Sequence, residues 1–208
     1  MIKKVQLFFR LPLSRKIFLI RRVFWRLKSI TIYRLVFREI SSSSVLMSPT
    51  FVTPEFISIG SKVKIWHDAR IEGVDEYAGK FFSPEIVIED GVEIHQRVNI
   101  SATHRLIIGS NTTISFDVMV TDNDHKYDDI NTHVGEQELF CRETRIGKNC
   151  FLGAGAKILA GTILGDNCII GANTVVRGEF PKGCVIAGSP AVIIKKYDYS
   201  SHLWIKSK

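Results

Sequence analysis

Residues 144–176 read TRIGKNCFLGAGAKILAGTILGDNCIIGANTVV, and in this stretch an aliphatic residue returns at every sixth position. The aliphatic residues are Ile146, Leu152, Ile158, Leu164, Ile170 and Val176. A small residue stands two positions before each of them: Thr144, Cys150, Ala156, Thr162, Cys168 and Thr174. A helix repeats every ~3.6 residues and a strand every ~2, so neither element alone explains a strict period of six. The stretch predicts a solenoid, in which short, similar turns of chain stack on one another.

The spacing also indicates how one turn of the solenoid is built. Each hexad supplies a short strand and a bend, its aliphatic residue points inward, and three hexads close one turn, so residues 18 apart stack directly. Strands of successive turns then pair in parallel about 4.8 Å apart. The same register recurs between residues 57 and 120, but residues 73–85 and 121–143 lack it. We expect these two segments to project as loops from a three-sided prism, and such loops often carry functional residues.

Three features of the sequence together resemble the left-handed β-helix acyltransferases, the hexapeptide-repeat family. They are the [Ile/Leu/Val]-Gly-x4 hexads, the segment AGSPAVIIKK at 187–196 and the DNDH at 122–125. The resemblance covers residues 57–196 and implies a mainly β fold, the left-handed parallel β-helix, whereas spacing alone predicts a coil but not its hand. It also implies acetyl transfer from acetyl-CoA as co-substrate, and a homotrimer with binding grooves between neighbouring prisms.

Charge divides the chain into an arm and a prism. Residues 1–40 carry eleven Lys and Arg against one acid, a net charge of +10, whereas the remaining 168 residues carry −3. We expect a basic amphipathic helical arm over residues 1–44, the β-helix domain over 45–196 with the extruded loop 121–143, and a tail over 197–208. The serine run at 41–44 would mark the hinge between arm and prism.

The arm is apolar as well as basic. Residues 13–39 lack Gly and Pro, which favours a helix. One face of this helix collects Ile20, Val23, Phe24, Leu27 and Ile30. No uncharged stretch approaches the ~20 residues of a membrane span, and basic residues interrupt any signal-peptide core. Two interpretations stay open, which are peripheral contact with an anionic membrane surface and a cap over the first coil. We expect a cytoplasmic protein, peripheral at the inner face of the cell membrane under the first interpretation, and no nucleic-acid partner, because no nucleic-acid motif accompanies the charge.

His125 is the candidate general base of an acyl transfer. A neutral imidazole accepts a proton near neutral pH, and carboxylates beside it stabilise the resulting imidazolium. Asp122 and Asp124 flank His125, although a solvated histidine in an acidic loop would look the same. The family's catalytic histidine lies in a loop at this place in the coil order, so the resemblance assigns the role to His125. Asn99 is either a residue near the acceptor, as the resemblance implies, or a corner residue that tolerates unusual dihedral angles.

The resemblance also implies where acetyl-CoA binds. Its pantetheine arm would lie along the small residues Ala154 and Ala172, and the backbone N–H of Ala154 would stabilise the oxyanion. Phe151 holds a place where the family often has Trp. The candidate phosphate-binding residues are Arg177, Lys195 and Lys196, although the two lysines are equally explained as a solvated charge pair. The chain departs from the family pattern at Val192, where Lys or Arg is usual.

These features favour an acetyl-CoA-dependent O-acetyltransferase that modifies a saccharide hydroxyl in the biosynthesis of a surface polysaccharide, such as a capsule or O-antigen. The arm suits a lipid-linked acceptor. An N-acetyltransferase of a nucleotide sugar or of serine is the alternative within the same class. A metal hydrase of the γ-carbonic-anhydrase type needs three converging histidines, and the close histidine pair of that family is absent from the sequence, so we expect no metal. A non-catalytic scaffold is a further alternative.

Overall fold

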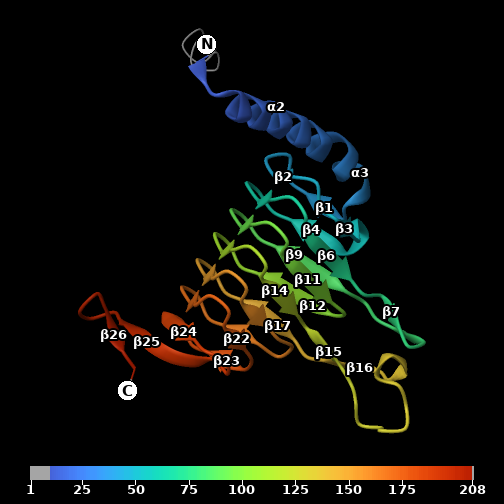
Figure 1. Ribbon diagram of the computed structural model, residues 1–208, viewed down its shortest axis with the longest axis vertical. Helices are drawn as coiled ribbons and strands as arrows, with labels where there is room; N and C mark the ends of the chain where they lie inside the picture. Colours follow the sequence, from blue (N-terminus) through green and yellow to red (C-terminus); the bar gives the residue numbers. More distant parts are fainter. Residues whose placement is uncertain (1–9, 208) are drawn as a thin grey trace.

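The chain winds into a coil with three flat sides, and the N-terminal helix lies across one end of the coil (Figure 1). A computed structural model describes residues 10–207. Successive strands join three different sheets in turn, so each turn of the coil contributes one strand to each side. Within the coil, neighbouring strands of each sheet run parallel, as the pairing of β10 with β5 and β13 illustrates. The mainly β fold expected from the hexads is confirmed.

The strands are short, as a period of six residues requires. The seven-stranded sheet contains β1 (Glu39–Ile40), β4 (Ile57–Ile59), β9 (Glu85–Ile88), β12 (Arg105–Ile108), β17 (Thr144–Ile146), β20 (Ile163–Leu164) and β23 (Glu179–Phe180). The nine-stranded sheet contains β2 (Val45–Leu46), β5 (Lys64–Ile65), β10 (Glu93–Ile94), β13 (Thr113–Ile114), β18 (Phe151–Leu152), β21 (Ile169–Ile170), β24 (Cys184–Ala187), β25 (Val192–Asp198) and β26 (Leu203–Lys206). The six-stranded sheet contains β3 (Phe51–Val52), β6 (Arg70–Gly73), β11 (Asn99–Ala102), β14 (Met119–Thr121), β19 (Lys157–Ile158) and β22 (Val175–Val176).

Residues 18 apart pair directly in the long hexad run, as predicted. Phe151 lies opposite Ile169, and Lys157 lies opposite Val175. The six aliphatic hexad residues and the six small residues that precede them are each at most 2% exposed. The core is therefore a column of aliphatic side chains, and deleting one of them, as in Leu152→Ala, is expected to cost about 2–5 kcal/mol.

Asparagine explains how the chain bends sharply between sides. Asn149, Asn167 and Asn173 adopt left-handed backbone conformations, with φ of 53°, 60° and 55°. Asparagine enters this region more readily than other residues with a Cβ because its short polar side chain bonds locally. The hexads thus supply a bend residue as well as a core residue.

The structure departs from the expected boundaries at both ends of the coil. β1 begins at Glu39 and pairs in parallel with β4, so the first turn starts before residue 45. Ser44, expected in a hinge, is buried, and its hydroxyl donates to the Gly60 carbonyl at 2.6 Å. At the other end, β25 and β26 form an antiparallel hairpin on the edge of the nine-stranded sheet, where a tail from residue 197 was expected.

The arm forms a helix that continues through a wider, π-helical turn into the coil. α2 spans Leu13–Lys28, a π-helical turn follows over Ser29–Tyr33, and α3 spans Arg34–Val36. None of the residues of α2 is buried, whereas Tyr33 and Phe37 are 7% and 6% exposed and belong to the core. The end of the arm therefore belongs to the core of the first turn, while α2 lies against β2 without burying any of its own residues. Within residues 10–207, no helix combines the length and apolarity needed to cross a membrane.

The chain leaves the coil twice, within the two segments that lack the hexad register. β7 (Glu76–Tyr77) and β8 (Lys80–Phe81) form one hairpin, and β15 (Asn123–His125) and β16 (Leu139–Cys141) form the other. Short 3-10 turns occupy Pro54–Phe56 and Val134–Glu136. The first hairpin follows β6 and the second follows β14, both strands of the six-stranded sheet. Both hairpins therefore leave from the same side of the coil, and they lie beside each other (Figure 1).

Candidate active site

His125 is the last residue of β15, in the second hairpin. It pairs across the hairpin with Leu139, which is buried, and this pairing fixes the backbone that carries the imidazole. The side chain of His125 is exposed and lines two neighbouring cavities, one on each side of the hairpin. A titratable ring held on a rigid hairpin beside open space is suited to proton transfer.

Tyr77 of the first hairpin holds the His125 ring. The Tyr77 hydroxyl lies 3.2 Å from His125 Nδ1 and donates to the Gly135 carbonyl at 3.0 Å. The two rings also pack edge to face, with centroids 5.4 Å apart. A carbonyl only accepts and a phenol has a single hydrogen, so both contacts are satisfied when Nδ1–H donates to the phenol oxygen. That arrangement leaves Nε2 as the unprotonated nitrogen of a neutral imidazole.

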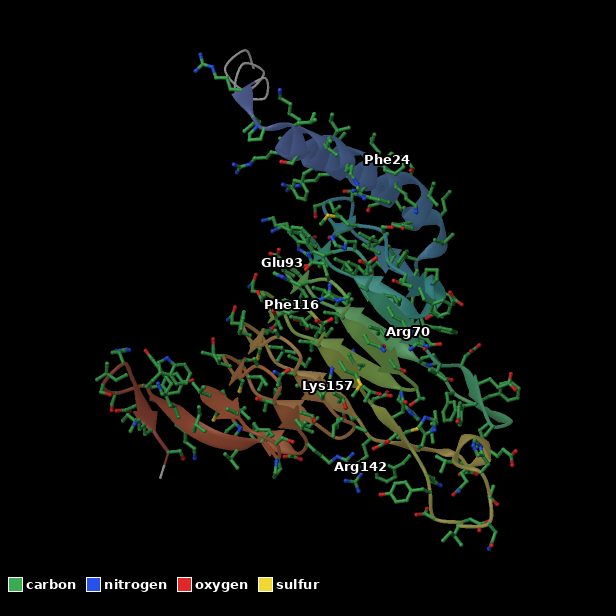
Figure 2. All side chains as sticks on the ribbon, viewed as in Figure 1. Phe24, Arg70, Glu93, Phe116, Arg142 and Lys157 are labelled. Carbon is green, nitrogen blue, oxygen red and sulfur yellow. The ribbon has the colours of Figure 1, made fainter. Side chains whose placement is uncertain are left out.

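The first cavity beside His125 is polar and lies on the outer side of the six-stranded sheet. It encloses about 240 Å³. Its lining residues are Arg70, Asn99, Ser101, Met119, Thr121, Asn123, Asp124, His125 and Leu159. Figure 2 labels Arg70, which lies on β6 and forms an ion pair with Glu72. Donors and acceptors therefore surround His125 on this side, as a ligand rich in hydroxyl groups would require.

Asn99 lies in this same cavity, at the first position of β11. It is flanked in the sheet by Arg70 and Met119, and it is half-buried. The corner position expected for Asn99 is wrong, because its backbone belongs to a strand that pairs on both sides. Its presence beside His125, however, places an amide where an acceptor would lie.

The two aspartates that flank His125 in the sequence differ in their contacts. Asp122 is fully buried, and its carboxylate accepts hydrogen bonds from the backbone N–H groups of Thr103 and His104, both at 2.8 Å. These contacts tie the base of the second hairpin to the turn before it. Asp122 therefore shapes the loop, and its carboxylate is directed to this turn rather than to the His125 ring.

Asp124 is exposed and lies next to His125. One carboxylate oxygen accepts from the backbone N–H of His125 at 3.0 Å, and the other accepts from Arg177 Nη2 at 2.9 Å. Arg177 and Asp124 both line the second cavity beside His125, with Lys126, Tyr127, Asp128 and Phe140. Arg177, expected at the phosphates of acetyl-CoA, is thus placed at the hairpin that carries His125.

Glu138 joins the two hairpins. Its carboxylate forms ion pairs with Lys80 of the first hairpin and with Lys126 of the second. Hydrogen bonds from these two ammonium groups hold the pKa of Glu138 below its ordinary value, and the same contact raises the pKa of Lys126. We call these two ion pairs the Glu138 clasp. Because Lys80 belongs to the hairpin of Tyr77 and Lys126 to the hairpin of His125, the clasp fixes the two hairpins relative to each other.

The remaining candidate residues for acetyl-CoA lie on or beside the nine-stranded sheet, whereas the polar cavity beside His125 lies on the six-stranded sheet. Phe151 and Ile169 are neighbours on β18 and β21, 45% and 37% exposed, and form an apolar strip. Ala154 and Ala172 stack at the following bend, where the Asn173 N–H donates to the Ala154 carbonyl. A Cβ at Gly153 would lie 2.7 Å from the Ala172 nitrogen, so only glycine allows these two turns to approach so closely.

Lys195 and Lys196 continue the same side of the coil. They lie on β25, which follows β18, β21 and β24 in the order of the nine-stranded sheet. Lys195 pairs with Val185 and shares the face of Phe151 and Ile169. Lys196, by contrast, pairs with buried Cys184 and points to the other face. The strip therefore runs from apolar and small residues to one cation, Lys195, an order that suits a long ligand with an apolar arm and an anionic end. Val192, where the sequence departs from the family pattern, begins this strand and is 57% exposed.

Sequence reasoning missed several residues of the polar cavity, above all Tyr77. The lining residues Arg70, Ser101, Thr121 and Asn123 were not singled out either. One signal could have found Tyr77: both register breaks follow the third hexad of a turn, after Ile71 and after Val120. Since equivalent hexads stack, segments inserted at equivalent hexads emerge side by side.

The histidines of the chain lie at separate places. His95 lies beside Trp66 and Glu93, and His104 packs against Phe82. Across the described residues 10–207, no group of three or more His, Cys, Asp and Glu side chains is arranged to hold a metal ion.

Comparison with known proteins agrees with the coil and its hexads. The family model "Bacterial transferase hexapeptide (six repeats)" matches residues 143–178. Nodulation protein L of Rhizobium meliloti (strain 1021) is 32% identical over 143 residues, which cover 64% of this chain and 77% of that protein. The chain belongs to the hexapeptide-repeat acyltransferase family.

A second relative and a solved structure extend the comparison. The "Putative lipopolysaccharide biosynthesis O-acetyl transferase WbbJ" of Escherichia coli (strain K12) is 37% identical over 129 residues. That match covers 59% of this chain and 66% of WbbJ, just under two thirds of its length. AntD, an N-acyltransferase from Bacillus cereus solved with dTDP and 3-hydroxybutyryl-CoA, superposes with a TM-score of 0.65 over 82% of this chain and 88% of AntD. At 14% identity, AntD supports the fold of this chain alone.

Proposed function

We propose that this protein is an O-acetyltransferase that transfers the acetyl group of acetyl-CoA to a hydroxyl of a saccharide used in surface-polysaccharide biosynthesis. The observation that carries the proposal is the placement of the His125 imidazole, with Nδ1 held by Tyr77, at a polar cavity that also contains Asn99. The name of WbbJ, a relative at 37% identity, supports both the O-acetyl transfer and the polysaccharide.

His125 acts as the general base in this proposal. Nε2 accepts the proton of the acceptor hydroxyl while the hydroxyl oxygen attacks the thioester carbonyl. The Tyr77 oxygen accepts from Nδ1–H, so the ring is oriented before the proton moves and the imidazolium keeps its hydrogen bond. When the carbon–sulfur bond breaks, the imidazolium returns the proton to the departing sulfur. A base of this kind typically contributes ~10²–10⁴-fold to the rate.

The polar cavity is the proposed acceptor site. Asn99, Ser101, Thr121 and Asn123 offer both donors and acceptors, which match the mixed donor and acceptor character of a sugar hydroxyl. Asp124 supports the backbone of His125 and is held by Arg177. Asp122 contributes by holding the base of the hairpin.

Acetyl-CoA supplies the activated acetyl group. The residues present suit it, because the strip of Phe151, Ala154 and Ala172 would hold its pantetheine arm, and Lys195, on the same face, would meet its phosphates. Lys196, the second candidate, points to the other face of β25. The Ala154 N–H would donate to the oxyanion. Arg177 is the weakest of these candidates, because Asp124 already occupies its guanidinium.

The strip lies on an open side of the coil, so a neighbouring coil is needed to close it into a groove. We therefore include in the proposal a homotrimer of left-handed coils, as the resemblance implies, working in the cytoplasm. The acceptor would be lipid-linked and would be met at the inner face of the cell membrane, where residues 1–40 provide a positively charged arm.

The test is release of free CoA from acetyl-CoA in the presence of a panel of acceptors. Sugars that carry hydroxyl groups and no amine should support release, and the acetylated product should be an ester, which mild alkali cleaves, and not an amide. His125→Asn should lower the rate at least ~10²-fold. His202→Asn is the matched control, because His202 lies on the distant C-terminal hairpin and should leave the rate unchanged. Full activity of His125→Asn would refute the mechanism, and a preference for amines would replace the O-acetyltransferase with an N-acetyltransferase.

A further inference from the structure

The outer face of α2 is a continuous apolar stripe. Its residues are Leu13, Ile20, Phe24 and Leu27, with exposed fractions of 73%, 60%, 58% and 53%. They are spaced by seven, four and three residues, so they lie along one side of the helix, and Ile17, at the edge of this side, lines the cavity between the helix and the coil. Figure 2 labels Phe24 on this helix, at the end of the molecule beyond β2. An exposed helix face this apolar normally packs against another protein surface or a membrane.

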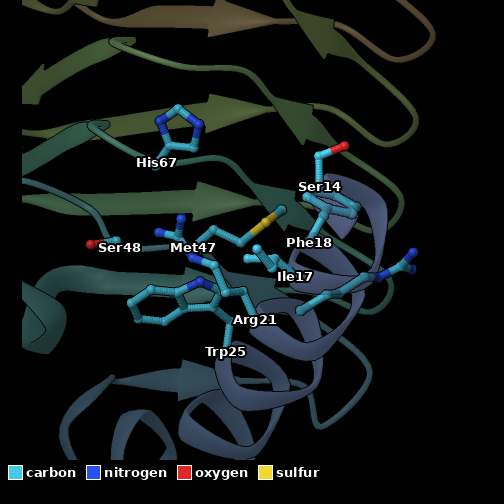
Figure 3. A pocket seen from close by; sticks show the side chains of 9 residues that line it. Ser14, Ile17, Phe18, Arg21, Trp25, Met47, Ser48 and His67 are labelled. Atoms are coloured by element: carbon cyan, nitrogen blue, oxygen red, sulfur yellow. The ribbon is translucent and has the colours of Figure 1, made fainter. Parts of the chain in front are cut away.

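The side of α2 next to the stripe packs on the coil. Phe18 stacks on Trp66 with ring centroids 6.0 Å apart, and Trp66 in turn donates to Glu93 at 3.0 Å. At the end of the helix, buried Ser29 accepts from the Leu46 N–H at 3.1 Å. Figure 3 shows Phe18 and Trp25 reaching from the helix toward Met47 and His67 of the coil. These contacts fix the rotation of α2 about its axis and leave the apolar stripe facing outward.

Cations border the stripe on the same segment. Residues 10–38 contain no acid, and their cations are Arg10, Arg15, Lys16, Arg21, Arg22, Arg26, Lys28, Arg34 and Arg38. Lys16, Arg21 and Lys28 flank the stripe, whereas Arg15, Arg22 and Arg26 lie on the opposite side of the helix. An apolar stripe flanked by long basic side chains complements an anionic lipid surface. The aliphatic stems of Arg and Lys extend along the bilayer while their charges reach the headgroups. A second copy of this chain is a poorer complement, because its coil carries a net charge of only −3 over 168 residues.

The length of α2 sets its orientation in the bilayer. Sixteen residues span about 24 Å, less than the ~30 Å of the hydrocarbon core, and basic residues recur through the helix. The helix therefore suits a position in the plane of the interface, with the stripe toward the acyl chains and the coil in water. Each stripe residue then buries apolar area, and each nearby cation adds electrostatic attraction.

We propose that the outer face of α2 docks the enzyme on an anionic lipid bilayer, with the coil directed away from it. This inference rests on the proposed function and deepens it by assigning the contact with the bilayer to one face of α2. α2 contacts β2, and β13, in the same turn as β14 and the His125 hairpin, lies three strand positions further along that sheet. At ~4.8 Å for each position, the site stands about 14 Å from β2, and the thickness of α2 adds about 10 Å to its distance from the docked face. The acceptor is therefore a lipid-linked saccharide long enough to bring its hydroxyl across that gap.

The test measures co-flotation of the full-length protein with vesicles. We expect the wild type to float with vesicles of phosphatidylcholine and phosphatidylglycerol, to bind pure phosphatidylcholine vesicles weakly, and to be released by high salt. The double variant Ile20→Ser, Phe24→Ser should bind the anionic vesicles about tenfold or more weakly. The matched control, Leu203→Ser, Ile205→Ser, changes two exposed apolar residues of the C-terminal hairpin, 63% and 51% exposed, and should float like the wild type.

Three outcomes would overturn the inference. They are a wild type that does not float with anionic vesicles, a double variant that floats as well as the wild type, and a double variant whose only defect is a smaller oligomer in sedimentation. The last result would assign the stripe to a second copy. Circular dichroism of the variant checks that the coil is intact.

Activity separates failure of the docking from failure of the proposed function. With a lipid-free saccharide, the double variant should release CoA at the wild-type rate, because the stripe lies three turns from His125. With the same saccharide on a lipid in anionic vesicles, the wild type should be faster than the variant by about the ratio of their vesicle binding. Flotation without acetyl transfer to any acceptor would refute the function while leaving the docking in place. Acetyl transfer without flotation would refute the docking alone.

Discussion

Replacing Tyr77 with Phe tests the structural assignment of the His125 tautomer. The change removes one oxygen and keeps the ring that packs edge to face on the imidazole. Two hydrogen bonds disappear, one of 3.2 Å to His125 Nδ1 and one of 3.0 Å to the Gly135 carbonyl. The imidazole is then free to carry its proton on either nitrogen, and the fraction with an unprotonated Nε2 falls.

The magnitude follows from the exposure of the partners. A hydrogen bond between neutral groups contributes a net ~0.5–1.5 kcal/mol, and here water can replace the lost partner. Of the two lost bonds, only the one to Nδ1 acts on the ring that takes the proton. Loss of this one contribution from the transition state should lower kcat about 2- to 10-fold. KM for the saccharide should change little, because Tyr77 is not among the residues that line the polar cavity.

The assay combines kinetics with spectroscopy. Initial rates of CoA release at saturating saccharide give kcat, and the ¹⁵N chemical shifts of the His125 ring report which nitrogen carries the proton. Tyr127→Phe is the matched control, because Tyr127 lies in the same hairpin segment and is 76% exposed. Unchanged kcat and ring shifts in Tyr77→Phe, or an equal loss in Tyr127→Phe, would refute the reasoning.

Two further predictions concern stability. Among the buried side chains of residues 10–207, Thr174 has a hydroxyl with no hydrogen-bond partner, whereas the hydroxyl of Thr162, at the equivalent place in another hexad, donates to a carbonyl at 2.6 Å. Thr174→Val should therefore raise the free energy of unfolding by about 1 kcal/mol and Thr162→Val should lower it by about 1 kcal/mol, both measured by urea denaturation; equal effects would contradict the hydrogen-bond assignment. Burial of the Glu93 carboxyl opposes its ionisation, but contacts with Trp66 and Lys64 outweigh burial and hold the pKa of Glu93 below 4.5. The resulting stability is complete above pH 4.5 and is lost as the pH falls through the lowered pKa, so the melting temperature of the wild type should drop more between pH 5 and pH 3 than that of Glu93→Gln.

The hexads predicted the coil because the same local pattern decides burial, bend and strand pairing. The first turn was missed although Ile40, Leu46 and Val52 keep the interval of six. The serines at 41–44 look like a linker, but Ser44 is a small residue inside the coil, as its hydrogen bond to the next turn shows. The serine-rich composition wrongly indicated a hinge, whereas the six-residue interval of the aliphatic residues correctly indicates a turn of the coil.

The sequence predicted only those residues of the site that a local motif marks. His125 stands out in its acidic loop, yet nothing local distinguishes buried Asp122 from exposed Asp124. Tyr77 is 48 residues from His125, and their contact depends on two hairpins meeting outside the coil. No periodic pattern encodes such a contact, because the hairpins are not part of the repeat.

The two hairpins that meet over the polar cavity begin and end at bends of the same side of the coil. The coil between and beyond them continues without a change of register, since β11 pairs in order with β6 and β14. Insertion or exchange of a hairpin there leaves the hydrophobic column untouched. A chimera that exchanges both hairpins together would therefore move Tyr77, His125 and the Glu138 ion pairs as one unit, and would leave Asn99 and Ser101 of the polar cavity in the coil.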